Sequence, residues 1–392
     1  MNNETMDNET MSLITVSEAF KISYCVITAL VIIIGVIGNS LVIYVVVRFS
    51  SMQTIANIHL MNLSIADLVF LISGFIFLSN VIQKSFIFGL IGCKIYLIMT
   101  GVNSFTSTYS MTLMSIDRYL AVCHPISSKS IRNPRMTKWI ILGLWLFSFV
   151  LMMPLMIYGN LVSWSNENEH SINNGSMTLL NMSLDIKQIN QYACVINWNI
   201  SGKLTSHGFT LYNFGFGFLC PVVIICILYP LVIIRLHNVG PRNKSQERRD
   251  LNRRITRLVL AIVALYIILW LPYWVLQLFT IFHDQEYSAS ARMLIMYLNL
   301  TMLCLNYINS AINPILYAFM SPNFRSSFQL LIICYQSRPY MISGTISQIP
   351  QETIQSACHK TLKINNHQNI ILNQPLITKA ADSQRCTELI VN

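Results

Sequence analysis

The sequence predicts an all-α membrane protein, a seven-transmembrane helix bundle followed by a short amphipathic eighth helix. The chain of 392 residues is 54% hydrophobic and only 11% charged, whereas soluble domains carry roughly 25% charged residues. It contains seven apolar runs of the length, roughly 20 residues, that a helix needs to cross a bilayer. The links between these runs alternate between rich and poor in Lys and Arg. These observations predict an integral membrane protein rather than a soluble one.

The seven apolar runs define the transmembrane elements in order. They span residues 23–48, 57–82, 94–122, 138–158, 208–236, 256–282 and 293–319. No long internal repeat is apparent, which argues against a transporter built from two related halves. Runs four to seven each contain a proline inside or near one end, where the missing N–H permits a kink; these are Pro154, Pro221, Pro272 and Pro314.

Basic residues predict the orientation of the bundle. The link between runs three and four holds four of them, Lys129, Arg132, Arg135 and Lys138, and the link between runs five and six holds more. The positive-inside rule assigns these links, and with them much of the net charge of +10, to the cytoplasm. We therefore expect a multi-pass plasma-membrane protein that binds no nucleic acid, with the N-terminus outside and the C-terminus inside.

The segments outside the bundle carry candidate modification sites. The first 22 residues form an extracellular tail, and five glycosylation sequons fall on the predicted outer side: Asn3, Asn8, Asn174, Asn181 and Asn199. After run seven, apolar residues recur at helical spacing at Phe324, Phe328, Leu331 and Ile332, which predicts an eighth helix in the membrane plane. Cys334 is a candidate for palmitoylation or a simple free thiol. The bundle domain is expected to span 23–336, with a disordered cytoplasmic tail over 337–392.

Three cysteines lie at or near the predicted outer side, where disulfides persist: Cys25, Cys93 and Cys194. Pairing Cys93 with Cys194 would pin the long outer link over the mouth of the bundle, whereas Cys25 is expected to be a packed thiol. The sequence contains no zinc-site spacing, nucleotide-binding loop or hydrolase elbow. We therefore expect no enzymatic activity.

Polar residues inside the predicted membrane are functional candidates because they are costly there. Asp67 lies in the middle of run two, and oxygen-bearing side chains occur in runs three and seven at Asn103, Ser107, Asn309 and Asn313. Such oxygens suit a small hard cation such as sodium. The alternative is a hydrogen-bonded network that holds the helices together. Trp270, two residues before Pro272, could change rotamer when a ligand presses on it, or simply pack in the core.

An ordered set of motifs resembles the rhodopsin-like (class A) G-protein-coupled receptors. In chain order the matches are Gly38-Asn39, "LSIAD" at 63–67, Cys93, "DRYLAVCHP" at 117–125, Trp145, Pro221, Tyr229, "WLP" at 270–272 and "NPILY" at 313–317. The stretches "DRYLAVCHPIS", "LPYWVLQ" and "NSAINPILYAFMSPNFRSSF" are similar to those of the peptide-receptor branch with somatostatin, opioid and allatostatin C receptors. This resemblance covers the chain from run one through the short helix after run seven.

The chain departs from this family pattern at several positions. Somatostatin and opioid receptors have an Asp seven residues after the cysteine of the third helix, where this chain has Thr100. The departure disfavours a monoamine ligand and makes allatostatin C receptors the better match. Tyr266 stands where Phe is usual. Asn252 stands where some receptors carry an acid that pairs with the arginine of helix three, and Thr256 resembles the opioid-type substitute for that latch.

The resemblance implies a receptor for an extracellular neuropeptide. It implies a ligand cavity beneath the Cys93–Cys194 lid, lined by Thr100, Ser104, Asn213, Tyr273, Gln277, Asn299 and Tyr307. It implies a switch and G-protein contact at Asp117, Arg118, Tyr229, Thr256, Trp270, Pro272 and Tyr317, with an allosteric sodium ion as the one possible cofactor. The inhibitory G-protein class, arrestin, receptor kinases and membrane lipids are the expected partners. A receptor for another peptide or small ligand, or a seven-helix transporter or channel, is the alternative.

Overall fold

The computed structural model describes residues 3–49, 52–164, 191–197, 202–238, 246–283, 288–320 and 324–325. The chain divides into two compact units, Met1–Phe324 and Arg325–Asn392, and every helix and strand below belongs to the first. Most of the predicted eighth helix, Cys334 and the predicted domain boundary at 336–337 lie outside the described residues. So do three of the five sequons, Asn174, Asn181 and Asn199.

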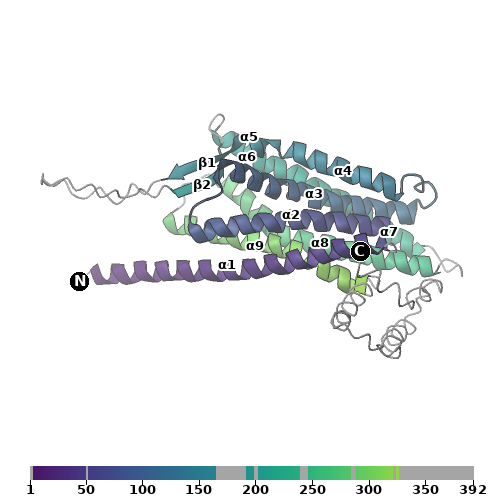
Figure 1. Cartoon of the computed structure of the whole chain (residues 1–392), viewed down its shortest axis with the longest axis horizontal. Coiled ribbons are helices and arrows are strands. Elements are labelled where there is room, and N and C mark those ends of the chain that lie inside the picture. Colours follow the sequence, from purple (N-terminus) through teal and green to yellow (C-terminus); the bar gives the residue numbers. More distant parts are fainter. Residues whose placement is uncertain are drawn as a thin grey trace, which may run out of the picture. The chain divides into compact units, whose positions relative to one another are not determined.

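Within the described ranges, the helices form seven long segments that run side by side (Figure 1). They are α1 (Asn3–Arg48), α2 (Ile55–Gln83), α3 (Gly89–Cys123), α4 (Pro134–Leu151) followed by α5 (Met153–Tyr158), α6 (Gly202–Phe214) followed by α7 (Cys220–Asn238), α8 (Gln246–Phe282) and α9 (Ala289–Met320). Each predicted run lies inside one of these segments, so the all-α bundle is confirmed. Because α1 begins at Asn3, most of the expected tail over 1–22 continues the first helix, including Asn3 and Asn8.

The third segment differs from the others in composition. Among the described residues, six segments are long and apolar enough to cross a membrane, and α3 is not one of them. Its buried face carries Thr106, Ser107, Thr108, Ser110, Thr112 and Ser115. Polar side chains are tolerated there because α3 packs against α2, α4, α5, α7 and α8, and several hydroxyls donate to the carbonyl one turn earlier. The segment whose buried face is rich in hydroxyls is therefore one that packs against five other helices.

Small residues bring α1 close to its neighbours. A Cβ on Gly35 would lie 2.7 Å from Leu71 Cδ1 and 3.0 Å from Ala311 Cβ, so α1 packs tightly on α2 and α9 at this point. Asn39 lies one turn further along and donates from Nδ2 to the carbonyls of Gly35 at 2.9 Å and Ser310 at 3.0 Å. Close backbone approach and interhelical hydrogen bonds are the usual way in which membrane helices associate.

A two-stranded antiparallel ribbon lies in the link between the fourth and fifth segments, and the sequence did not predict it. It pairs β1 (Gly159–Trp164) with β2 (Gln191–Ile196), with Leu161 opposite Cys194. A disulfide joins Cys93 to Cys194, with 5.5 Å between their Cα atoms, so the predicted pairing is confirmed. The Phe86 N–H donates to the Tyr192 carbonyl at 2.7 Å. The ribbon is thereby attached to the start of α3 and to the α2–α3 link.

The fifth segment is interrupted by a π-helical turn over Gly215–Leu219, between α6 and α7. The Cys220 N–H donates to the Gly215 carbonyl five residues earlier, and Pro221 follows without an N–H of its own. The Tyr109 hydroxyl donates to the Phe216 carbonyl at 3.0 Å. A Cβ on Gly217 would lie 3.3 Å from the Phe105 ring, so glycine allows this turn to approach α3 closely.

Candidate functional site

The two ends of the bundle carry different chemistry. We call the end that holds the Cys93–Cys194 disulfide the disulfide end, and the end that holds Arg118 the arginine end. In Figure 1 the ribbon of β1 and β2 lies at the same end of the bundle as the start of α1. Because α3 begins just before Cys93 and ends just after Arg118, it connects the two ends directly.

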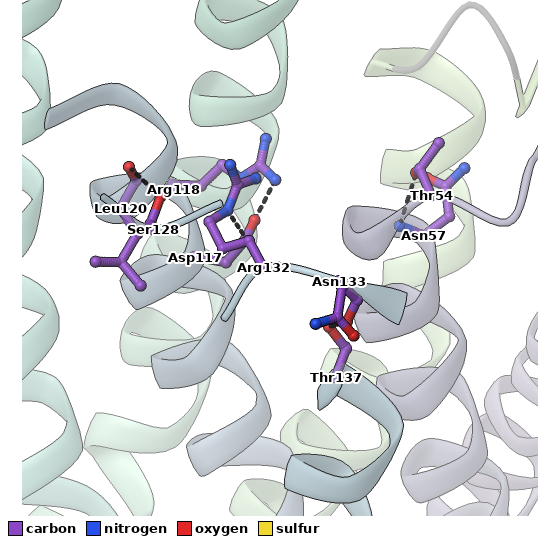
Figure 2. Close-up of polar contacts among 9 residues, drawn as sticks. All are labelled: Thr54, Asn57, Asp117, Arg118, Leu120, Ser128, Arg132, Asn133 and Thr137. Carbon is purple, nitrogen blue, oxygen red and sulfur yellow. Dashed lines mark hydrogen bonds and ion pairs between the residues drawn. The ribbon is translucent and has the colours of Figure 1, made fainter. Parts of the chain in front are cut away.

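At the arginine end, one buried carboxylate pairs with two guanidinium groups (Figure 2). Asp117 forms ion pairs with Arg118, its neighbour on α3, and with Arg132, whose Nε lies 2.7 Å from Asp117 Oδ1. The side chains of Asp117 and Arg118 are only 7% and 6% exposed, and that of Arg132 is 20% exposed. Buried charges of this kind persist only when they are paired. Two predicted switch residues, Asp117 and Arg118, are thus paired directly, and Arg132 is an additional member of the cluster.

The link between α3 and α4 positions Arg132. Ser128 donates from Oγ to the His124 carbonyl at 2.7 Å and to the Leu120 carbonyl at 3.2 Å. The Arg132 N–H donates to the Ser128 carbonyl at 2.8 Å, and Asn133 caps α4 by accepting from the Met136 N–H at 2.8 Å. Figure 2 shows Ser128 and Asn133 on either side of the ion pairs. Arg132 is therefore held between two ordered helix ends.

Three predicted switch residues bear buried hydroxyls. The side-chain oxygens of Thr256, Tyr229 and Tyr317 have no hydrogen-bond partner among the described residues. The expected latch between Thr256 and Arg118 is therefore not formed in this structure, and the side chain of Asn252 lies outside the described residues. A small cavity of about 10 Å³ separates Arg118 from α2 and α8, which is room for about one water molecule.

The predicted sodium-site residues form two bonded pairs. Asp67 is buried, and its Oδ2 accepts from Asn313 Nδ2 at 2.8 Å. Ser107 donates to Asn103 Oδ1 at 2.9 Å within α3, and Asn309 is buried on α9. The second oxygen of Asp67 has no partner among the described residues. An unpaired buried carboxylate oxygen fits the requirement of a cation site.

The predicted ligand-site residues fall into bonded pairs and core positions. Thr100 donates to the Tyr96 carbonyl at 3.0 Å and lies 3.3 Å from the Ser73 hydroxyl on α2. Gln277 on α8 donates to Asn299 on α9 at 3.0 Å. The remaining four residues do not join these pairs. Asn213 donates to a carbonyl of its own helix, and Ser104 is partly buried. Tyr273 contacts Trp270 and Trp274, and Tyr307 stacks on Phe70 in the core.

Trp270 belongs to a chain of aromatic rings along α8. Its ring centroid lies 5.8 Å from that of Tyr266 and 6.0 Å from that of Tyr273. Phe218, from the π-helical turn, contacts Tyr266 at 5.9 Å. Pro272 lies inside α8 within this stretch of the sequence, so the predicted kink position is flanked by aromatic groups of α8, and one of these contacts the π-helical turn. The sequence indicated Tyr266, Trp270 and Tyr273 singly, but it did not show that their rings touch or that Phe218 joins them.

A polar network that the sequence analysis missed joins three helices. Trp145 on α4 donates from Nε1 to Asn62 Oδ1 at 2.8 Å, and Asn62 Nδ2 donates to the Ser110 hydroxyl on α3 at 2.6 Å. Asn62 is fully buried on α2. Its sequence signal is a polar Asn inside an apolar run. The network fixes the relative positions of α2, α3 and α4.

This arrangement, with a disulfide-pinned ribbon at one end of seven helices and a buried acid–arginine pair at the other, is that of a seven-transmembrane receptor. The model of the family "7 transmembrane receptor (rhodopsin family)" matches residues 38–317. The chain therefore belongs to the rhodopsin family of seven-transmembrane receptors and is a multi-pass membrane protein. This membership confirms the resemblance that the motifs indicated, and the family is one of receptors rather than enzymes.

Several curated relatives are similar over most of the chain. Somatostatin receptor type 2 of Mus musculus is 36% identical over 314 residues, which cover 80% of this chain and 76% of the relative. Somatostatin receptor type 4 of Rattus norvegicus is 35% identical over 306 residues, with 78% and 71% coverage. Somatostatin receptor type 1 of Rattus norvegicus is 33% identical over 306 residues, with 78% and 70% coverage.

Proposed function

We propose that the chain is a plasma-membrane receptor that binds an extracellular peptide of the somatostatin or allatostatin C type and activates a heterotrimeric G-protein. The buried Asp117–Arg118 pair carries this proposal. It keeps the Arg118 guanidinium neutralised at the end of the bundle opposite the disulfide-pinned ribbon, from which it could be released to contact a partner. The similarity to somatostatin receptors supports a peptide as the ligand. In this proposal the disulfide end faces outward and the arginine end faces the cytoplasm, as the positive-inside rule predicts.

The proposed peptide site lies at the disulfide end, where the one described acidic side chain is paired with a lysine. Among the side chains that the structure describes, the acidic residues are Glu18, Asp67 and Asp117, and Glu18 pairs with Lys84 at 3.2 Å. Thr100, bonded toward Ser73, presents a hydroxyl and no carboxylate. We therefore expect the peptide to be bound by neutral hydrogen bonds and aromatic contacts at this depth, which favours an allatostatin C-like ligand.

Peptide binding would activate the receptor by favouring a second arrangement of the helices. Only a ligand that binds the active arrangement more tightly than the resting one shifts the equilibrium. We propose that α8 swings about Pro272 and that Arg118 leaves Asp117 to contact a G-protein of the inhibitory class. The Tyr229 and Tyr317 hydroxyls would then accept hydrogen bonds from the Arg118 guanidinium. Both hydroxyls are unpaired among the described residues and so are available for this role.

An ion site at Asp67 and several modification sites elsewhere in the chain complete the proposal. Asp67 would hold a sodium ion in the resting arrangement, where the ion supplies the positive charge that the buried carboxylate lacks. Asn313, which bonds to Asp67, and the polar side chains of Asn103, Ser107 and Asn309 are the other proposed ligands. The Ser/Thr-rich tail would be the substrate of receptor kinases and the docking site of arrestin. Palmitoylation at Cys334, glycosylation at the five sequons and lipid contact at the basic link complete the expected modifications and partners.

A peptide panel applied to cells that express the chain tests the proposal. We expect at least one peptide of this type to inhibit adenylyl cyclase at low concentration, and Arg118→Ala to abolish the response at unchanged surface expression. Arg135→Ala is the matched control, because Arg135 lies at the same end but is exposed. Retention of the response by Arg118→Ala, or peptide-independent solute flux in liposomes containing the purified chain, would contradict the proposal.

A further inference from the structure

A short interhelical contact between uncharged side chains in the buried part of the bundle joins Thr108 on α3 to Tyr266 on α8. Their side-chain oxygens lie 2.6 Å apart, and the two residues are 0% and 2% exposed. Tyr266 is also the position at which the sequence departs from the phenylalanine that is usual in the family. A tyrosine hydroxyl in an apolar interior is costly unless it finds a partner, and Thr108 supplies one.

The direction of this hydrogen bond follows from the other bond that Thr108 makes. The Thr108 hydroxyl lies 2.7 Å from the Ser104 carbonyl, which can only accept. A threonine hydroxyl has a single proton, so that proton is committed to Ser104. Tyr266 is therefore the donor and Thr108 Oγ1 the acceptor in the interhelical bond. Removing the tyrosine hydroxyl leaves Thr108 satisfied, whereas removing the threonine hydroxyl leaves a buried O–H without an acceptor.

The position of Tyr266 along α8 places the bond on the part of the helix that is proposed to move. Tyr266 precedes Pro272 by six residues, which is about 9 Å along a helix, and lies on the arginine-end side of that proline. Among the side chains that the structure describes, this is the one hydrogen bond between α3 and α8. Thr256, closer to the arginine end, makes none. The bond therefore fastens the part of α8 that moves in the proposed function.

We propose that the Tyr266–Thr108 hydrogen bond is a latch that holds α8 against α3 and suppresses signalling in the absence of ligand. Tyr266 acts as a positioning residue, because holding α8 against α3 keeps Arg118 in its resting arrangement. The bond takes the place of the latch that Thr256 was expected to form at the arginine end. The inference rests on the proposed function, because it concerns the resting arrangement of a receptor.

A set of four variants separates the latch from ordinary packing. Tyr266→Phe should raise the rate of ligand-independent nucleotide exchange on the G-protein about three- to tenfold. This is the shift in the resting–active equilibrium expected from the loss of one buried neutral hydrogen bond between membrane helices. Thr108→Val should raise it at least as much and also lower the melting midpoint, because it orphans the tyrosine hydroxyl. Thr108→Ser keeps the acceptor and should behave as wild type. Adding Thr108→Val to Tyr266→Phe should change basal exchange little further.

Thr112→Val is the matched control for the loss of a threonine hydroxyl. Thr112 donates to the Thr108 carbonyl at 3.0 Å within its own helix and is equally buried, so its loss should leave basal exchange at the wild-type level. The latch is overturned if Tyr266→Phe shows wild-type basal exchange at equal surface expression. It is also overturned if Thr112→Val raises exchange as much as Thr108→Val, since the effect would then come from loosened packing.

A conformational measurement distinguishes failure of the latch from failure of the proposed function. A fluorophore on Arg257→Cys, at the exposed arginine end of α8, reports movement of this helix in the purified chain without any ligand or G-protein. We expect Tyr266→Phe to shift its emission, and Thr112→Val to leave it unchanged. An unchanged signal with Tyr266→Phe refutes the latch. A shifted signal in a chain that activates no G-protein supports the latch and refutes the signalling function.

Discussion

The cluster of Asp117, Arg118 and Arg132 at the arginine end predicts different effects of two substitutions on basal signalling and stability. Asp117→Asn removes the only anion of the cluster and leaves the guanidinium groups of Arg118 and Arg132 facing a neutral amide. Arg132→Gln removes the second cation and leaves the Asp117–Arg118 pair intact. If the pair restrains Arg118, the first substitution should increase basal signalling and the second should not.

The magnitudes follow from burial. Breaking a buried ion pair costs about 3–5 kcal/mol, because the remaining charge has no partner, and Asp117 and Arg118 are both over nine-tenths buried. We expect Asp117→Asn to lower the free energy of unfolding by about 3 kcal/mol. The Arg132 side chain is 20% exposed, so solvent compensates part of its loss. Arg132→Gln should cost about 1 kcal/mol, between the values for surface and buried pairs.

Ligand-independent nucleotide exchange in membranes and thermal melting in detergent measure the two effects. Surface expression is matched before comparison, and Arg135→Gln serves as the control because Arg135 is exposed at the same end of the bundle. Basal exchange that does not rise in Asp117→Asn would refute the restraint on Arg118. Equal destabilisation by Asp117→Asn and Arg132→Gln would refute the assignment of Asp117 as the shared anion.

Three further predictions concern the rest of the molecule. Cys194→Ser should remove the disulfide that closes a loop of 101 residues, lower stability by about 4 kcal/mol and abolish the peptide response, while Cys25→Ser leaves binding and mobility on non-reducing gels unchanged. Trp145→Phe should deprive Asn62 of its donor and lower the melting midpoint by the equivalent of about 1 kcal/mol; an unchanged midpoint would show that the network adds nothing. Asp67→Asn should make peptide affinity the same in NaCl and KCl at equal ionic strength, and a persistent difference would contradict a sodium site at Asp67.

Features that depend on segment length and composition could be predicted from the sequence. The seven helices follow from apolar runs, and the Cys93–Cys194 pairing follows from compartment and the family pattern. Asp117 and Arg118 were indicated by the family pattern as well, and as neighbours in the chain they lie at the same end of α3. Each of these inferences needs only local sequence or a count of crossings.

Features that depend on the rotation of one helix against another could not be predicted. Arg132 was one of four bases in a link, and only the turns around Ser128 select it to meet Asp117. Thr256 was expected to contact Arg118, but its hydroxyl remains unpaired. Tyr266 was recognised as unusual, yet nothing in the sequence indicated Thr108 as its partner. The ribbon was missed because its two six-residue strands are separated by a long link.

The π-helical turn at Gly215–Leu219 divides the fifth segment into two parts whose registers are independent. Each residue of an α-helix advances about 100° around the axis, so one residue more or less in this turn would rotate Asn213 and the rest of α6 by about that angle. The α7 part, with Pro221 and Tyr229, would keep its orientation toward the arginine end. Insertion or deletion at this turn is therefore a route by which descendants of this gene could acquire a new ligand preference while retaining an unchanged output.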